Sequence, residues 1–328
     1  MLRYFALPGV VTLALLAVIY VYFGITAFFI AALLTVLEIT LSFDNAVVNA
    51  RVLAKMDAKW QKRFLTWGIF IAVFGTRILL PIVIVSVAVW ASPLFIAKTA
   101  LFDPVHYGEL LDGVASAIHS FGAAFLLLVA LKYFLDSTKE VHWIQSIEKH
   151  LKLWGRMEAV EIVLVLVAIV AISFFVGVEQ TSVLVGGIFG VVLFVVMQGI
   201  TSAFSVEIEG VATKSAALFI YLEVLDSAFS LDGVIGAFAL TSSIPIIAVG
   251  LGIGAYFVRS LTVYMVRQRT LDTLVYLENG AHWAIFGLAV SMLVSLLTHV
   301  PEVITGTIGL VFVVAAYFSS LRVGTQKN

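Results

Sequence analysis

The sequence predicts an all-α polytopic membrane protein, with about ten transmembrane helices in two inverted halves and both termini in the cytoplasm. Three observations carry this prediction: an apolar composition, cationic residues confined to alternate links, and an acidic motif that occurs twice. The 328 residues are 62% hydrophobic and 12% charged. A soluble domain is about half apolar and about a quarter charged, so we expect one integral membrane domain, 1–328, in a lipid bilayer.

Apolar stretches of membrane length recur from one end of the chain to the other, since about 20 residues cross the bilayer core. The expected spans are 6–23, 26–54, 64–90, 113–135, 159–176, 183–205, 215–240, 244–266, 280–298 and 303–321. The division between the fifth and sixth spans depends on a short polar link, Val178-Glu179-Gln180-Thr181-Ser182. We expect the first span to be retained, because it is longer than the apolar region of a signal peptide.

Lysine and arginine gather in every second link between the expected spans. The other links nearly lack them, and Lys98 is the exception. Because cationic loops stay in the cytoplasm, the even-numbered links and both termini are expected there, with the protein in the cytoplasmic membrane. The formal net charge of −1 gives no basic field for nucleic acid. Cysteine is absent, which excludes a thiolate metal site and a cysteine nucleophile.

The longest cytoplasmic link, 136–158, has an amphipathic pattern. Its apolar residues recur at helical spacing, opposite several charged residues; they are Trp143, Ile147, Leu151 and Trp154. This pattern predicts an interfacial helix on the cytoplasmic leaflet. An anchor between two spans is preferred to a partner-binding role.

An acidic motif occurs in the second expected span and again in the seventh. The two copies are Glu38-x-x-x-Ser42-x-Asp44-Asn45 and Asp226-x-x-x-Ser230-x-Asp232-Gly233. Asn49 follows the first copy, and Glu223 precedes the second. A charge near the bilayer centre costs at least ~2.5–3.5 kcal/mol on insertion scales, so these charges indicate function. The alternative is a structural polar network, which would not need five carboxylates.

Each acidic span is followed by a span with one arginine, Arg77 in the first half and Arg259 in the second. Both arginines lie at the same spacing from a glycine, and both are predicted counter-charges to the acids. The motif spans are separated by an odd number of crossings and therefore run in opposite directions. This is an inverted repeat with halves 1–176 and 183–328, and it predicts a substrate site near the midplane.

The residue types predict the chemistry of that site. In a regular helix Asp44 points away from the stripe shared by Glu38, Ser42 and Asn45, so we expect a break near 44–45, and likewise near 232–233. Carboxylate, amide and hydroxyl oxygens suit Mn²⁺, Ca²⁺ or Mg²⁺ better than Cu⁺ or Zn²⁺. The cation would be the substrate, and no permanently bound cofactor is expected.

The paired motif resembles the TerC family of integral membrane proteins, part of the LysE-related transporter superfamily. The resemblance extends from about Ala31 to Phe318. It implies manganese export and an association with tellurium resistance. The family's acidic membrane residues correspond by position to Glu38, Asp44, Asn45, Glu223, Asp226 and Asp232. Gly233 stands where the first copy has Asn45, and the cystathionine-β-synthase-like regions of some relatives are absent, which puts nucleotide regulation in doubt.

The leading hypothesis is a secondary transporter, most simply an exporter, of a divalent cation with manganese favoured. The expected ion ligands are Glu38, Asp44, Asn45, Asp226 and Asp232. Glu223 would exchange protons, and the supporting polar residues are Ser42, Ser230 and Asn49. His119 and His282 are candidate relays, for which simple helix-helix hydrogen bonds are the alternative.

Two other classes of function are kept open. The first is a non-transporting membrane partner in a stress-response or insertion complex, and a homo-oligomer is compatible with the sequence too. The second is an intramembrane aspartyl protease, which needs two carboxyl groups sharing one proton. The chain lacks the sequence contexts of known intramembrane aspartyl proteases and has more acids than a dyad needs. We therefore expect no enzyme activity.

Overall fold

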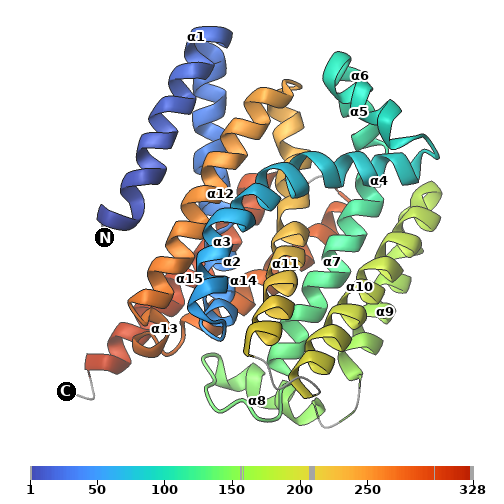
Figure 1. Ribbon diagram of the computed structural model, residues 1–328. Coiled ribbons are helices and arrows are strands. Elements are labelled where there is room, and N and C mark those ends of the chain that lie inside the picture. Colours follow the sequence, from blue (N-terminus) through green and yellow to red (C-terminus); the bar gives the residue numbers. More distant parts are fainter. Residues whose placement is uncertain (1, 156, 158, 207–210, 299, 326–328) are drawn as a thin grey trace.

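The computed structural model (Figure 1) describes residues 2–155, 157, 159–206, 211–298 and 300–325. Within these residues the chain forms helices and no strand, as the composition predicts. Six helices among the described residues are long and apolar enough to cross a membrane; they are Tyr4–Leu41, Ala58–Ala88, Ala115–Phe134, Gly177–Ile200, Ile244–Arg267 and Leu277–Ser295. The described part of the chain is therefore that of a multi-pass membrane protein.

The first part of the chain forms a helical hairpin followed by a broken helix and a long tilted one. Gly24 interrupts α1 with φ 84°, and Figure 1 shows the two arms of α1 side by side. A left-handed φ of this kind is readily adopted by glycine, which is why the turn occurs there. The helices are α1 (Leu2–Leu41), α2 (Phe43–Leu53), α3 (Ala58–Phe70), the π-helix η1 (Ile71–Leu79) and α4 (Leu80–Ala88).

Two short helices occupy the link expected between the third and fourth spans. They are α5 (Pro93–Phe102) and α6 (Pro104–Asp112). Each begins with proline behind a capping side chain: Ser92 accepts from the backbone N–H of Phe95, and Asp103 from that of His106. No helix was predicted in this link, so these two helices are an addition to the predicted fold.

The middle of the chain contains one buried helix, α7 (Ala115–Phe134), and a helical hairpin. The hairpin consists of α9 (Val160–Ser173) and α10 (Gln180–Val206), joined by a 3-10 turn, η2 (Gly177–Glu179). Two separate helices thus occupy the region of the predicted fifth and sixth spans, although α9, with 14 residues, is shorter than the described helices that are long enough to cross a membrane. The predicted helix in the 136–158 link is confirmed as α8 (Gln145–Trp154).

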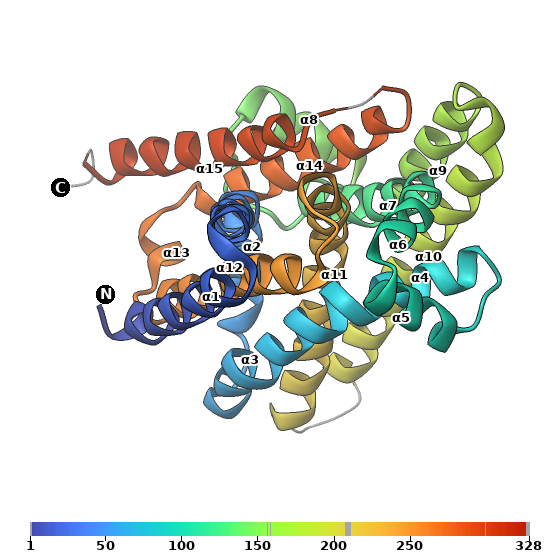
Figure 2. The same ribbon diagram turned by 90° about the horizontal axis from the view of Figure 1, so that it is seen from above.

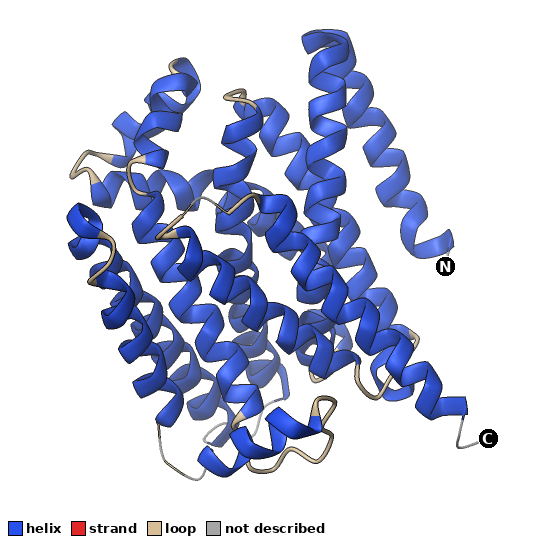
Figure 3. Cartoon of the chain, turned by 180° about the vertical axis from the view of Figure 1, so that it is seen from behind, coloured by secondary structure: helices blue, strands red, loops and turns tan. Residues whose placement is uncertain are grey.

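The last part of the chain supplies the second motif helix and its neighbours. They are α11 (Val211–Leu240), α12 (Ile244–Arg267), α13 (Thr270–Thr273), α14 (Leu277–Ser295) and α15 (Glu302–Thr325). Figure 1 shows α8 and α13 at the lower end of the molecule and α5 and α6 at the upper end, and Figure 3 gives the same arrangement from behind. The links rich in lysine and arginine at α8 and α13 therefore share one end.

Close helix packing positions the motif helices. Seen from above, α2 and α11 lie among α12, α14 and α15, with α9 and α10 at the periphery (Figure 2). A Cβ atom added to Gly250 would lie 3.0 Å from the carbonyl oxygen of Ala31, and one added to Gly254 would meet the side chain of Glu38. These two glycines let α12 approach α1 closely, as their small-x-x-x-small spacing predicts.

Candidate functional site

The first acidic motif lies at a helix break. The break falls at Ser42, with φ −98° and ψ 14°, two residues before the predicted position. The hydroxyl of Ser42 donates to Glu38 Oε1 at 3.2 Å. Asp44 and Asn45 consequently occupy the first turn of α2, where the N-terminal end of the helix favours negative charge and oxygen ligands.

The second motif has no such break, and the prediction of one near Asp232-Gly233 is wrong. Helix α11 continues from Val211 to Leu240. Gly233 lies near the other motif, since a Cβ atom there would be 3.5 Å from Glu38 Oε2, an ordinary van der Waals contact. The side chain of Asp232 lies outside the described residues, although its backbone belongs to α11.

Arg77 pairs with Glu38, as predicted. Its Nη2 donates to Glu38 Oε1, and its Nη1 donates to the carbonyl oxygen of Ala72 at 2.7 Å. Arg77 belongs to the π-helix η1, a conformation that is rare and often marks functional sites. The side chains of Arg77 and Glu38 are only 2% and 5% exposed, so the pair is buried.

Arg259 holds two acids of the second motif. Its guanidinium donates to both oxygens of Glu223 at 2.9 Å and to Asp226 Oδ2 at 2.8 Å. The guanidinium also lies 4.4 Å from the ring centroid of Phe64. Gly68 makes room for this arrangement, because a Cβ atom there would meet Arg259 and lie 2.7 Å from Glu223 Oε1.

The two motifs are joined by a direct hydrogen bond. Asn45 Nδ2 donates to Asp226 Oδ1 at 2.7 Å. Asn45 is aligned with Gly233, and Asp226 is aligned with Glu38. Gly233 lies near Glu38, since a Cβ atom there would be 3.5 Å from Glu38 Oε2, but glycine has no side chain to form the equivalent bond. Of the two aligned pairs, only Asn45 and Asp226 share a described side-chain hydrogen bond.

Asp44 is the described motif acid that has no counter-charge. It is buried, none of the described lysines or arginines forms an ion pair with it, and its Oδ1 has no hydrogen-bond partner among the described residues. Further buried oxygens without a described donor are Asn45 Oδ1, Asn49 Oδ1 and Ser230 Oγ. Buried oxygens are normally satisfied, and three of these four acceptors lie on α2, so the first motif is where a proton or a cation is expected.

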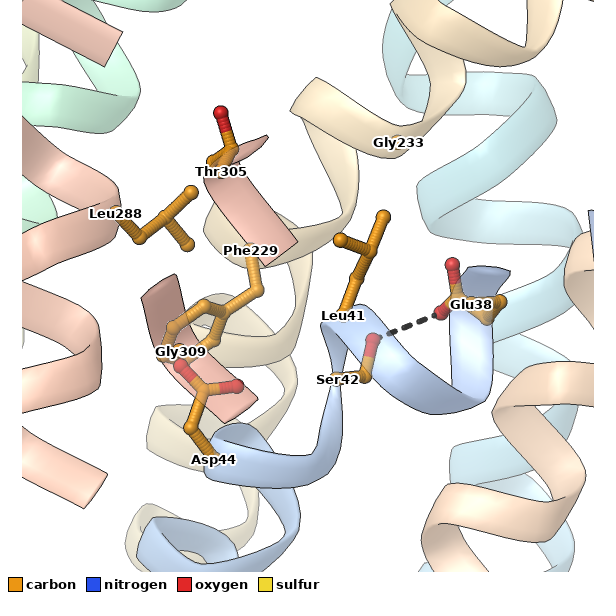
Figure 4. Close-up of a pocket in the computed structure, with 9 residues that line it drawn as sticks. All are labelled: Glu38, Leu41, Ser42, Asp44, Phe229, Gly233, Leu288, Thr305 and Gly309. Carbon is orange, nitrogen blue, oxygen red and sulfur yellow. Dashed lines mark hydrogen bonds between the residues drawn. The ribbon is translucent and has the colours of Figure 1, made fainter. Parts of the chain in front are cut away.

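A small cavity of about 30 Å³ lies beside Asp44. Figure 4 shows Asp44 next to α15 at Gly309, with Glu38 and Ser42 on the other side of Leu41. Phe229 of α11 and Leu288 of α14 also line the cavity. The volume is sufficient for one or two small occupants, because a single water needs ≳ 10–15 Å³.

The cavity includes two residues of α15 that the sequence analysis missed. Thr305 lines it and shares a 2.8 Å hydrogen bond with Ser291 of α14. Gly309 is close to Asp44, since a Cβ atom there would lie 3.7 Å from Asp44 Oδ2. Neither residue belongs to a repeated motif, and their only sequence signal was a small or polar side chain in an apolar span.

The two candidate relay histidines lie away from this cavity. His282 is stacked on Tyr133, with 3.6 Å between the ring centroids, and its Nδ1 lies 2.8 Å from the carbonyl oxygen of Glu278. His119 lies in α7, next to Ser120, whose hydroxyl donates to the carbonyl oxygen of Val183 at 2.6 Å. Neither histidine lines the cavity at Asp44.

Another buried carboxylate, Glu148 of α8, connects the 136–158 link to α14. It accepts from Lys139 Nζ at 2.8 Å, from Asn279 Nδ2 at 2.9 Å and from Trp283 Nε1 at 2.9 Å. The backbone N–H groups of Trp143 and Ile144 donate to it as well. The sequence analysis did not single out this residue.

The donors around Glu148 determine its ionisation. Burial alone raises the pKa of Glu148, but the hydrogen bonds from Lys139, Trp283 and the Ile144 backbone together outweigh it and hold the pKa below its ordinary value. Burial lowers the pKa of Lys139 against the opposing effect of Glu148. The bonds from Asn279 and Trp283 to Glu148 therefore join α8 to α14.

Comparison with known protein families shows that one family model matches most of the chain. The family model described as "Protein of unknown function (DUF475)" matches residues 43–327. No curated protein matches the chain, and no solved structure does. Among the described residues, no group of three or more histidine, aspartate or glutamate side chains is arranged to hold a metal ion.

Proposed function

The chain belongs to the DUF475 family, whose description assigns no activity, and from its own geometry we propose that it is a cation transporter of the cytoplasmic membrane. In this proposal the cargo is a divalent cation, and manganese is the favoured ion. It binds at Asp44 on the break between α1 and α2 and is exported in exchange for protons. The observation that carries the proposal is the group of buried oxygen acceptors on α2 that have no described donor.

The balance of charge supports a cation as the cargo. The described buried side chains of the two motifs include four acids, Glu38, Asp44, Glu223 and Asp226, and the facing helices contribute two arginines. Two negative charges are thus left for protons or for a cation to neutralise, because unpaired charges are not stable in a low dielectric. An anionic cargo would add to this excess.

The choice of a divalent, oxygen-loving cation depends on the ligand types. Carboxylate and amide oxygens favour Mn²⁺, Ca²⁺ and Mg²⁺, and no cysteine is present to favour a softer metal. The resemblance to the TerC family supports manganese within this group. Arg259 already pairs with Glu223 and Asp226. Asp44 is therefore better placed than Glu223 to bind the cation and a proton in turn.

The paired contacts support the proposed inverted halves. Arg77 pairs with Glu38 and Arg259 pairs with the aligned Asp226. Ten crossings would place the basic, even-numbered links at one end of the molecule. The basic links at α8 and α13 do lie at the same end (Figure 1). In such a transporter the halves move relative to each other around a fixed site near the midplane.

Metal tolerance of cells tests this function. Cells lacking their own manganese exporter would carry the wild-type chain, Asp44→Asn, Asp232→Asn or the control Asp112→Asn, which changes an exposed aspartate at the end of α6. We expect wild type and the control to restore growth in excess manganese, and the two motif variants to fail at equal membrane abundance. Full tolerance in both motif variants would contradict the proposal and favour a non-transporting membrane partner.

A further inference from the structure

The Glu38–Arg77 ion pair joins two separate cavities. Glu38 lines the cavity beside Asp44, and Arg77 lines a second cavity of about 200 Å³. Helix α11 borders both, through Gly233 in the first and Phe238 in the second. The only described polar contact that links the two linings directly is the ion pair itself.

The second cavity, which we call the vestibule, lies toward the upper end of Figure 1. Its lining includes Ala97 and Ala100 of α5, Tyr107 of α6 and Ile247 of α12. Helices α5 and α6 lie at the end opposite α8 and α13 (Figure 1). By the distribution of lysine and arginine this end faces away from the cytoplasm. The vestibule is therefore on the side to which an exporter delivers its cargo.

Arg77 lies in a π-helical segment. The π-helix Ile71–Leu79 contains more residues per turn than an α-helix, and the carbonyl oxygen of Ala72 bonds the guanidinium. Conversion of this segment to an α-helix would rotate Arg77 about the helix axis relative to Glu38. Arg77 Nε has no described partner, so one donor is already free to take a new acceptor.

We propose that the Glu38–Arg77 pair is the outer gate of the transport route and separates the cargo cavity at Asp44 from the vestibule. This inference rests on the proposed transport function. In the described state the gate is closed, because both side chains are almost fully buried. A cation arriving at Glu38 competes with Arg77 for the carboxylate, so the cargo itself favours opening.

The absence of cysteine from the chain makes the gate directly testable. Thr305→Cys places one thiol in the cargo cavity, and Ala100→Cys places one in the vestibule. Val167→Cys on α9, a 61% exposed apolar position, serves as a lipid-facing control. Each variant in proteoliposomes is treated with a membrane-impermeant cationic thiosulfonate on the vestibule side, and the labelling rate is measured.

The gate predicts three labelling rates. Ala100→Cys reacts readily, while Thr305→Cys and Val167→Cys react slowly. Neutralising the pair by Glu38→Gln with Arg77→Gln raises the rate at Thr305→Cys by at least about tenfold, equivalent to about 1.4 kcal/mol less closure. The double change is used because it leaves no unpaired buried charge that could unfold the protein. Arg77→Lys keeps the charge and keeps the slow rate.

An unchanged rate at Thr305→Cys in the double variant would overturn the gate, provided that Ala100→Cys still reacts as in the parent and so reports an intact vestibule. If Ala100→Cys loses its reactivity too, the pair is neutralised instead by Glu38→Gln with Arg77→Met and scored by the same criterion. Manganese flux is recorded in the same vesicles. If the double variant labels faster at Thr305→Cys but the parent protein shows no manganese flux, the transport function is contradicted and the gate is kept. If the parent protein transports manganese but labelling in the double variant is unchanged, the gate alone is contradicted.

Discussion

Asn45 on α2 and Asp226 on α11 share a 2.7 Å hydrogen bond, although 181 residues separate them in the chain. Asp226 also binds Arg259 at 2.8 Å, so the bond connects the broken helix to the buried arginine of the other half. The Oδ1 atom of Asn45 stays without a described donor. Asn45 therefore both orients the second motif and contributes an oxygen beside Asp44.

Replacing Asn45 tests this connection. Asn45→Ala leaves Asp226 with one donor fewer in a buried position, so we expect the apparent free energy of unfolding in detergent to fall by about 1–3 kcal/mol. Asn45→Asp places a carboxylate against Asp226 and is expected to cost more than the alanine variant. Thermal unfolding of the purified variants measures both. An aspartate variant as stable as wild type would contradict the contact.

Gly68 is predicted to be intolerant of any side chain. A Cβ atom there would overlap the Arg259 guanidinium, so Gly68→Ala must displace the ion pair with Glu223. We expect a loss of about 1–3 kcal/mol, as for overpacked cores. Gly199→Ala is the matched control, because nothing lies within 4 Å of a Cβ atom at that position. Equal unfolding temperatures for the two alanine variants would show that α3 does not pack on Arg259 as described.

Arg259 should be essential for folding unless its acids are neutralised with it. Arg259→Gln leaves Glu223 and Asp226 buried without a cation, and removing one partner of a buried pair costs about 3–5 kcal/mol. Adding Glu223→Gln to Arg259→Gln removes one of the unpaired charges. We expect the double variant to recover part of the lost expression and unfolding temperature. Purely additive losses in the two variants would argue against the pairing.

The attachment of α8 should depend on pH through Glu148. The pKa of Glu148 is held below its ordinary value of 4.5 in the folded protein, so the unfolded chain binds the proton more readily. The stabilisation is therefore fully present above about pH 4.5 and is lost as the pH falls through the lower, folded pKa.

Hydrogen exchange reports this directly, since the amides of Trp143 and Ile144 donate to Glu148. Their protection factors should fall in acid while those in the middle of α7 persist. In Glu148→Gln the protection of these two amides should be weak at every pH. A fall in acid that survives the glutamine substitution would assign the effect to another group.

The fold could be predicted where it depends on residues that are close together in the sequence. The apolar stretches predicted a membrane protein built from helices, and the polar link at 178–182 indicated that α9 and α10 are separate helices, whereas α5, α6 and α13 were not predicted. The amphipathic spacing of Trp143 to Trp154 predicted α8. The hairpin turn at Gly24 also matched the expected boundary between the first two spans.

The site was predictable only in part, because its geometry depends on packing between distant helices. The repeated motif identified the acids and arginines that pair, Glu38 with Arg77 and Asp226 with Arg259. It could not identify Thr305 or Gly309, which contribute through position alone. The break expected near Gly233 is absent, because α11 continues to Leu240, so the motif and its glycine were not sufficient to predict a break.

The most direct test of the central claim is manganese flux through the purified protein in proteoliposomes that contain a manganese-sensitive dye. We predict uptake that depends on an opposing proton gradient, that is abolished by Asp44→Asn and that persists at the wild-type rate in Asp112→Asn. Wild-type vesicles that take up no more manganese than empty ones, or an Asp44→Asn variant that transports as fast as wild type, would contradict the account.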